Sequence, residues 1–219
     1  MSKEWNVLLV EDDSDAAALL KTLLSDVVNG IRIARTGQEA ILVTGSRTPD
    51  LVIMDLMLPE LDGFEASRYF KHKFADTCVP ILVLTANPDA AARERISKIG
   101  CEAIMAKPYE PDQLVDMVRG LVSLANAERA LVEAQAQAAA GAEPKKKGWF
   151  GRGKREDAEP VDLSSFVKAA CDARAETLAL LDAVGAKDLF PIHLDRLRSL
   201  DPNHPSISEY SASAAEGQQ

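Results

Sequence analysis

LVIMDLMLPELDG, at residues 51–63, is the stretch of the sequence that decides the fold. It opens with an apolar run, Leu51 to Asp55, of the length and β-branched content expected of a buried parallel strand, yet this run ends in a carboxylate. Open α/β sheets place their chemistry at the carboxyl ends of such strands. An isolated acid before Pro59 and Gly63 could equally belong to a turn, so the other strands must decide between the two interpretations.

The first half of the chain alternates strand-like and helix-like segments around that stretch. Four other short apolar runs are predicted strands, at residues 7–10, 31–34, 80–85 and 103–106. Apolar spacing, capping residues and helix stops predict helices at residues 14–28, 38–43, 64–71 and 89–99, and a last one from about 111. Continuously apolar strands are typical of a parallel sheet covered on both faces, so we predict a doubly wound α/β domain.

The composition argues against several classes of protein. The chain has 219 residues, 47% of them hydrophobic, which is enough for one well-buried domain and a smaller unit. Its net charge of -9 argues against a general nucleic-acid binder. The sequence has neither the apolar core of a signal peptide nor the ~20 apolar residues of a membrane span. Three widely spaced cysteines favour a reducing compartment, so we expect a cytoplasmic protein.

Polar side chains stand at the ends of four predicted strands. Glu11 and Asp12 follow the first, Asp55 ends the third, Thr85 ends the fourth and Lys107 follows the fifth. Because all of them lie at carboxyl ends, they can converge on one crevice. Packed carboxylates repel one another unless a cation neutralises them, and a hard divalent ion, Mg²⁺, meets that need. The hydroxyl of Thr85 and the ammonium of Lys107 are donors suited to a phosphoryl group on Asp55.

At these residues the sequence resembles the receiver domain of two-component response regulators, over roughly residues 6–124. The motifs that carry the resemblance follow the order of the family: VLLVEDD, ARTGQEAI, LVIMDLMLPELDG, PILVLTA and IMAKP. The spacings also fit, with 43 residues from Asp12 to Asp55, 30 from Asp55 to Thr85 and 52 from Asp55 to Lys107. The resemblance implies a flavodoxin-like fold with a five-stranded parallel sheet.

The resemblance also implies roles in phosphoryl transfer. Asp55 would be the phosphoacceptor, Thr85 the switch hydroxyl and Lys107 the phosphate-binding lysine, with a cis bond before Pro108. The Asp55 carboxylate would attack the phosphorus of a phosphohistidine, on a histidine kinase or a phosphotransfer protein, or of a small phosphodonor. Since such a domain catalyses only its own modification, we expect a signalling protein and not an enzyme acting on a separate substrate.

The same resemblance implies a metal site and bears on the lifetime of the modification. Glu11 and Asp12 would bind Mg²⁺, Asp12 directly and Glu11 through water, with Asp55 and the backbone carbonyl of Met57 as further ligands. Met57 lies two residues after the acceptor, and Asn87 lies two residues after the threonine. Because the thioether of Met57 cannot position a water by hydrogen bonding, we predict slow dephosphorylation.

One position departs from the pattern of the family. Three residues before Lys107, where the family often has an aromatic switch residue, this chain has Ile104. Isoleucine is stiff at χ1 and has no hydroxyl, so a flip of an aromatic ring is in doubt here. The alternative is that Ile104 packs in the edge strand and that the switch works through the loop after Thr85.

The chain beyond the receiver divides into four segments. After a receiver at residues 1–124, we predict a helical extension at 125–142, a basic linker at 143–160, a small helical unit at 161–202 and a disordered tail at 203–219. An apolar 4-3 spacing continues along the last receiver helix, at Leu114, Val118, Leu121, Ala125 and Val132. This spacing leaves two alternatives, a coiled coil that forms a homodimer or a single long solvated helix.

The basic linker contains PKKKGWFGRGKR at residues 144–155, with six cations, no acid and two central aromatic residues, Trp149 and Phe150. Clustered cations around aromatic side chains suit an anionic membrane surface or a phosphate-rich partner. The alternative is a flexible linker that its lysines keep solvated.

The small helical unit contains two predicted helices, which end at Gly185 and Pro202. Two helices seldom bury a stable core alone, so the unit should dock on the receiver, on a second copy or on a partner. His193 lies in this unit, but the four-helix bundle that a phosphotransfer histidine needs is lacking. We therefore interpret His193 as a structural or surface residue.

Three classes of output remain. A DNA-binding transcriptional regulator would need a basic recognition helix, whereas the C-terminal helices carry Asp172, Glu176, Asp182 and Asp195. An enzyme such as a nucleotide cyclase does not fit in the remaining ~95 residues. We therefore expect output by interaction with an unknown downstream protein through the C-terminal extension.

Overall fold

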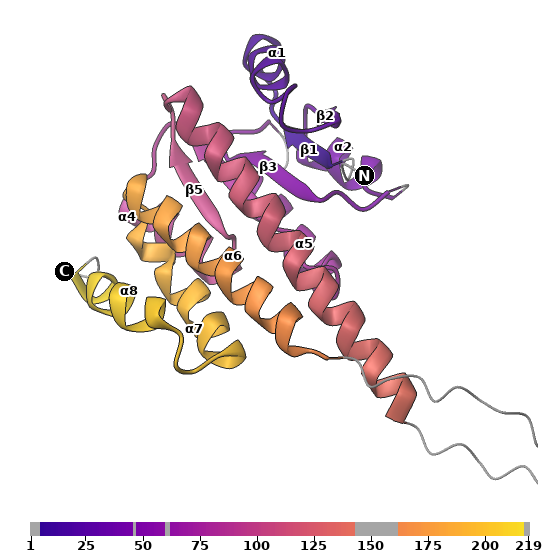
Figure 1. Cartoon of the computed structure of the whole chain (residues 1–219). Coiled ribbons are helices and arrows are strands. Elements are labelled where there is room, and N and C mark those ends of the chain that lie inside the picture. The colour runs from indigo at the N-terminus through magenta and orange to yellow at the C-terminus, as the bar shows by residue number, and fades with distance from the viewer. Residues whose placement is uncertain (1–4, 46, 60–61, 143–161, 217–219) are drawn as a thin grey trace, which may run out of the picture.

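The computed structural model describes residues 5–45, 47–59, 62–142 and 162–216 of the chain. Five parallel strands form one sheet in the order β2-β1-β3-β4-β5, as expected for the predicted doubly wound, flavodoxin-like fold. The strands are β1 (Asn6–Val10), β2 (Gly30–Ala34), β3 (Leu51–Asp55), β4 (Ile81–Thr85) and β5 (Ala103–Ala106). The helices between them are α1 (Ser14–Leu23), α2 (Gly37–Val43), α3 (Gly63–Lys73) and α4 (Ala90–Ile99), and α5 (Pro111–Ala142) follows β5. Figure 1 shows α5 lying across one face of the sheet.

Aspartates in the loops after β1, β3 and β4 cap the helices that follow. Asp13 caps α1 by accepting the N–H groups of Asp15 and Ala16, and Asp62 and Asp89 cap α3 and α4 in the same way. One predicted boundary is wrong, because α1 ends at Leu23 and not at residue 28. The apolar spacing continues to Val28, which is buried, but the backbone forms turns there before it enters β2.

The helix α5 continues without a break from the receiver into the predicted extension and has 32 residues. The sequence predicted that this helix forms either a coiled coil with a second copy or a single solvated helix. Instead, α6 (Ser164–Ala183) of the same chain runs antiparallel along it (Figure 1). A glycine in mid-helix costs about 1 kcal/mol, and Gly120 of α5 has a packing reason. A Cβ added to Gly120 would lie 2.5 Å from Cδ1 of Leu180, so the glycine lets α6 approach closely.

The C-terminal unit, which we define as residues 164–216, contains α6, a 3-10 turn η1 (Lys187–Leu189), α7 (Phe190–Leu200) and α8 (Pro205–Glu216). The prediction of a disordered tail is therefore wrong for residues 205–216. Its Ser- and Ala-rich composition hid an apolar pair at helical spacing, Ile207 and Tyr210, which packs against the core. The Tyr210 ring meets that of Phe190 edge-on, with centroids 5.3 Å apart.

The C-terminal unit docks on the receiver. This is one of the three docking alternatives that the sequence left open, beside a second copy and a partner. A buried ion pair joins Glu128 of α5 to Arg174 of α6. His193 of α7 is fully buried, with Nδ1 3.2 Å from Arg174 Nη1 and Nε2 2.9 Å from the carbonyl oxygen of Glu102, just before β5. This environment agrees with the interpretation of His193 as structural.

The basic linker at residues 143–160 lies outside the described residues, and so does the membrane-surface prediction that rests on it. Among the residues that the structure describes, no helix is long and apolar enough to cross a membrane.

Acidification should weaken the fold through His193. Burial, reinforced by the charge of Arg174, lowers the pKa of His193 to about 3 from its ordinary value of 6.5. As the pH drops through about 6.5, His193 takes up a proton in the unfolded chain but stays neutral in the folded chain. The free energy of unfolding therefore falls with the pH in this range. Between about pH 7 and pH 5 we expect a loss of about 2 kcal/mol, measured by urea unfolding. In His193→Gln this part of the pH dependence should be absent; an unchanged dependence would contradict the assignment.

Candidate functional site

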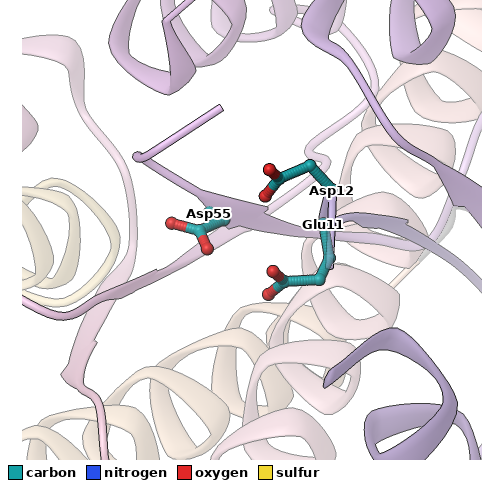
Figure 2. A group of neighbouring side chains, drawn as sticks. All are labelled: Glu11, Asp12 and Asp55. Carbon is teal, nitrogen blue, oxygen red and sulfur yellow. The ribbon is translucent and has the colours of Figure 1, made fainter. Parts of the chain in front are cut away.

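The candidate site lies at the carboxyl ends of β1 and β3, where the parallel sheet brings three acids together. Ligand oxygens of Glu11, Asp12 and Asp55 all lie within 4.8 Å of one another. Figure 2 shows the carboxylates of Glu11 and Asp12 directed toward the side on which Asp55 lies. Glu11 and Asp55 are buried, whereas Asp12 is exposed at the rim. The register of β1 against β3 produces this cluster, because Val10 pairs with Met54 and each acid follows directly.

Lys107 supplies the positive charge of the site from the turn after β5. Its Nζ donates to Asp55 Oδ2 at 2.6 Å and to Glu11 Oε2 at 2.7 Å. Burial raises the pKa of Glu11, although the hydrogen bond from Lys107 opposes this. Burial alone would lower the pKa of Lys107, but its bonds to Asp55 and Glu11 outweigh that effect and raise it. The lysine is therefore a full cation facing the acids.

The second oxygen of Asp55 and the fourth strand complete the site. Asp55 Oδ1 accepts the backbone N–H of Met57 at 2.8 Å, which orients the carboxylate. Thr85 ends β4 nearly fully buried, and its Oγ accepts the N–H of Asn87 at 3.2 Å. An open groove of about 720 Å³ runs beside Asp12, Met57, Thr85 and Asn87. The bond between Lys107 and Pro108 is cis, as predicted.

The family model of the response regulator receiver domain matches residues 7–119, more than half of the 219-residue chain. The chain belongs to this receiver family. The transcriptional regulatory protein GltR of Pseudomonas aeruginosa is 32% identical over 117 residues, which cover 53% of this chain and 48% of GltR. The response regulator MprA of Mycolicibacterium vanbaalenii is 33% identical over 116 residues, which cover 53% of this chain and 49% of MprA.

A solved structure supports the same assignment. The signal receiver domain of a histidine kinase from Syntrophus aciditrophicus is 29% identical, with a TM-score of 0.51, over 54% of this chain and 90% of that one. The chain spans about half the length of the two curated relatives named above. The likeness covers the receiver domain of this response regulator and leaves the C-terminal unit without a counterpart in these matches.

The receiver structure brings together the acids, the threonine and the lysine that the sequence predicts. Their roles, including that of the Met57 carbonyl as a ligand, stay predictions. Ile104 is buried in the edge strand β5, as the alternative interpretation expected.

Arg95 of α4 is a charged residue of the groove lining that was not predicted. Its guanidinium lies 3.7 Å from the centroid of the Phe64 ring and 3.8 Å from Asp62. These contacts join α4 to the beginning of α3. Nothing in the spacing of the sequence distinguishes Arg95 from the other cations of an exposed helix.

Gly63 is required where α3 begins against the end of β3. A Cβ added there would collide with the carbonyl oxygen of Asp55 and with Cα of Leu56, which are backbone atoms that cannot turn aside. We expect Gly63→Ala to lower the free energy of unfolding by about 1–3 kcal/mol, because the added methyl overpacks this contact. Gly30→Ala is the matched control, since its Cβ would have no neighbour closer than 3.9 Å. Equal urea midpoints for the two variants would contradict this requirement.

Proposed function

We propose that this receiver accepts a phosphoryl group on Asp55 from a histidine kinase or a phosphotransfer protein, and that its output is a protein-protein interaction through the C-terminal unit. The observation that carries the proposal is the pairing of a carboxylate, Asp55, with a cation, Lys107, at the carboxyl ends of the strands. Asp55 is held from both sides, by Lys107 and by the N–H of Met57, beside two further acids.

The donor set supports a divalent metal ion at this site. Three carboxylates face one another, and Lys107 bonds to two of them while Asp12 stays at the exposed rim. Hard oxygen donors with an open, hydrated side are what Mg²⁺ prefers, so Glu11, Asp12 and Asp55 would hold it, with the predicted help of the Met57 carbonyl. When bound, Mg²⁺ would neutralise charge on the transferring phosphoryl group.

The transfer is a nucleophilic displacement at phosphorus. An oxygen of the Asp55 carboxylate forms a bond to phosphorus while the bond from phosphorus to the donor imidazole breaks, and the imidazole leaves with the electron pair and takes up a proton. Lys107 can move its hydrogen bond from Asp55 to a phosphoryl oxygen, and the Thr85 hydroxyl can donate to another. Since the domain modifies only itself, we propose no separate substrate.

A shift in intact mass tests the proposal. Full-length protein is incubated with Mg²⁺ and a small acyl phosphate, and we expect a gain of one phosphoryl group that hydroxylamine removes, as it does from an acyl phosphate. Without Mg²⁺ the gain should be strongly reduced. No gain under any of these conditions would overturn the proposed function.

The output is tested separately. Pull-down with full-length protein, before and after phosphorylation, should recover a protein partner whose binding changes on phosphorylation, and light scattering would reveal a homodimer. Two relatives are named as regulators, one of them transcriptional, so retention on DNA and not on protein would instead favour the DNA-binding alternative.

The acyl phosphate should be long-lived. Met57 lies 70% exposed at the groove, and its thioether offers no strong hydrogen bond to orient an attacking water. We expect a lifetime of minutes or longer in Mg²⁺ buffer, followed by loss of the added mass. Met57→Gln, which restores a polar group of similar length, should shorten it. A wild-type lifetime of seconds would contradict this explanation.

A further inference from the structure

We propose that the ion pair between Arg93 and Asp188 couples the phosphoacceptor to the C-terminal unit, so that phosphorylation weakens the pair and frees the η1 end of the unit from α4. This inference rests on the proposed function of Asp55 and concerns what the modification does to the rest of this chain.

One side chain, that of Arg93, contacts both the loop after Thr85 and the C-terminal unit. Arg93, in the first turn of α4, donates from Nε to the carbonyl oxygen of Pro88 at 3.0 Å. The same guanidinium donates from Nη1 to Asp188 Oδ1 of η1 at 2.9 Å. Pro88 lies three residues after Thr85, in the loop that connects β4 to α4. A movement of this loop therefore changes the position of the cation that holds η1.

The loop is itself tied to the switch hydroxyl. Thr85 Oγ accepts the N–H of Asn87, the residue before Pro88. If Thr85 turns to donate to a phosphoryl group on Asp55, this hydrogen bond is strained or lost and the loop moves with it. In this proposal the signal passes from Thr85 through the loop to Arg93. It does not pass through Ile104, which is buried in β5 and has no ring to flip.

The Arg93–Asp188 pair is more exposed than the buried pair of Glu128 and Arg174, so it breaks more easily. Its side chains are 25% and 27% exposed, and Asp188 Oδ2 is buried without a hydrogen-bond partner among the described residues. Release would hydrate that oxygen, which compensates part of the lost bond. A partly exposed pair is held weakly compared with a buried one.

The second attachment lies at the opposite end of the sheet. Glu128 and Arg174 are buried against each other, and His193 contacts the carbonyl oxygen of Glu102 at the amino end of β5. Among the residues that the structure describes, the hydrogen bonds of these groups do not reach the loop after Thr85. Release of the η1 end would therefore leave the unit attached at Glu128, and the movement is a local opening and not a complete dissociation.

Linkage makes the coupling reciprocal. If a phosphoryl group on Asp55 weakens the pair, then weakening the pair must favour the phosphorylated form by the same factor, for which about 5-fold to 150-fold is typical. Asp188→Asn removes the charge of the carboxylate and keeps its shape, and it leaves the contact between Arg93 and Pro88 in place. Asp195→Asn is the matched control, because Asp195 is an exposed acid of the same unit whose ion pair is with Arg198 of its own helix.

The experiment uses the full chain with Mg²⁺ and beryllofluoride, a mimic of the phosphoryl group. Fluorine resonance reports occupancy of Asp55 and gives the affinity, while amide hydrogen exchange reports opening at the η1 end, residues 186–189. In the unaltered chain we expect the mimic to speed exchange there by about 5-fold or more. Asp188→Asn should show fast exchange without the mimic and bind it correspondingly more tightly, and Asp195→Asn should behave like the unaltered chain.

The outcomes separate the two proposals. Occupancy of Asp55 without a change in exchange at residues 186–189, or equal affinities in Asp188→Asn and Asp195→Asn, would overturn the coupling and leave the proposed function standing. Absence of any bound mimic in the unaltered chain would overturn both. Arg93→Gln is a second variant that removes the same ion pair, and it should also show fast exchange. It tests the coupling if the Asp188→Asn protein does not fold.

Discussion

Replacing Asp55 by Asn is expected to reduce phosphoryl incorporation to the background of the assay. Asparagine keeps the size of the side chain and can still accept the N–H of Met57, but its amide is not a nucleophile toward phosphorus. Stability should be retained or raised, because the substitution removes one of three clustered carboxylates and the charge of Asp55 contributes to the raised pKa of Glu11. Intact mass after incubation with an acyl phosphate and Mg²⁺ measures the effect.

The matched control for Asp55 is Asp76→Asn. Asp76 is an exposed acid that precedes β4, at the end of the sheet opposite the site. Its amide variant should gain mass as the unaltered chain does. Incorporation in Asp55→Asn at the level of Asp76→Asn would show that another residue accepts the group.

Replacing Glu128 by Ala is expected to produce the largest loss of stability outside the site. Arg174 is 5% exposed and would keep its buried charge without a counterion. Breaking a buried pair from one side costs about 3–5 kcal/mol. His193 packs against the same guanidinium, so α6 and α7 should loosen together. We expect a lower urea midpoint and faster amide exchange in α6 and α7, with the sheet less affected.

Two further variants identify the cause of that loss. Glu133→Ala, an exposed acid of the same helix, should change stability by at most about 0.5 kcal/mol. The double variant Glu128→Leu with Arg174→Met replaces the pair by apolar groups and should recover most of the stability, as replacement of whole buried pairs does elsewhere. If Glu128→Ala proves no more harmful than Glu133→Ala, the buried pair is not what attaches the C-terminal unit.

Much of the receiver could be predicted because its signals are local. Five apolar runs became five strands, and the acids and hydroxyl at their ends converged because parallel strands end at one edge of the sheet. Boundaries were less predictable, as the early end of α1 shows. Apolar spacing reports which residues are buried, and Leu24 and Val28 are buried in turns as they would be in a helix.

The C-terminal half was harder to predict because its signals depend on distant partners. The helix α8 follows a Ser- and Ala-rich pattern that composition alone assigns to a disordered tail, and Phe190 completes the contact that its Tyr210 makes. The role of Gly120 was equally hidden, since only the approach of Leu180 gives a reason for a glycine within a long helix.

The sequence by itself determined the parallel sheet, the family and the residues at the strand ends, because strand periodicity and motif spacing are properties of neighbouring residues. Only the tertiary structure decided that α6 covers α5 and that Arg93 joins Pro88 to Asp188. Arg93 and Asp188 are 95 residues apart in the chain, so no local pattern records their contact. Packing of an apolar helix face selects its partner by shape and charge, and those exist only once the chain has folded.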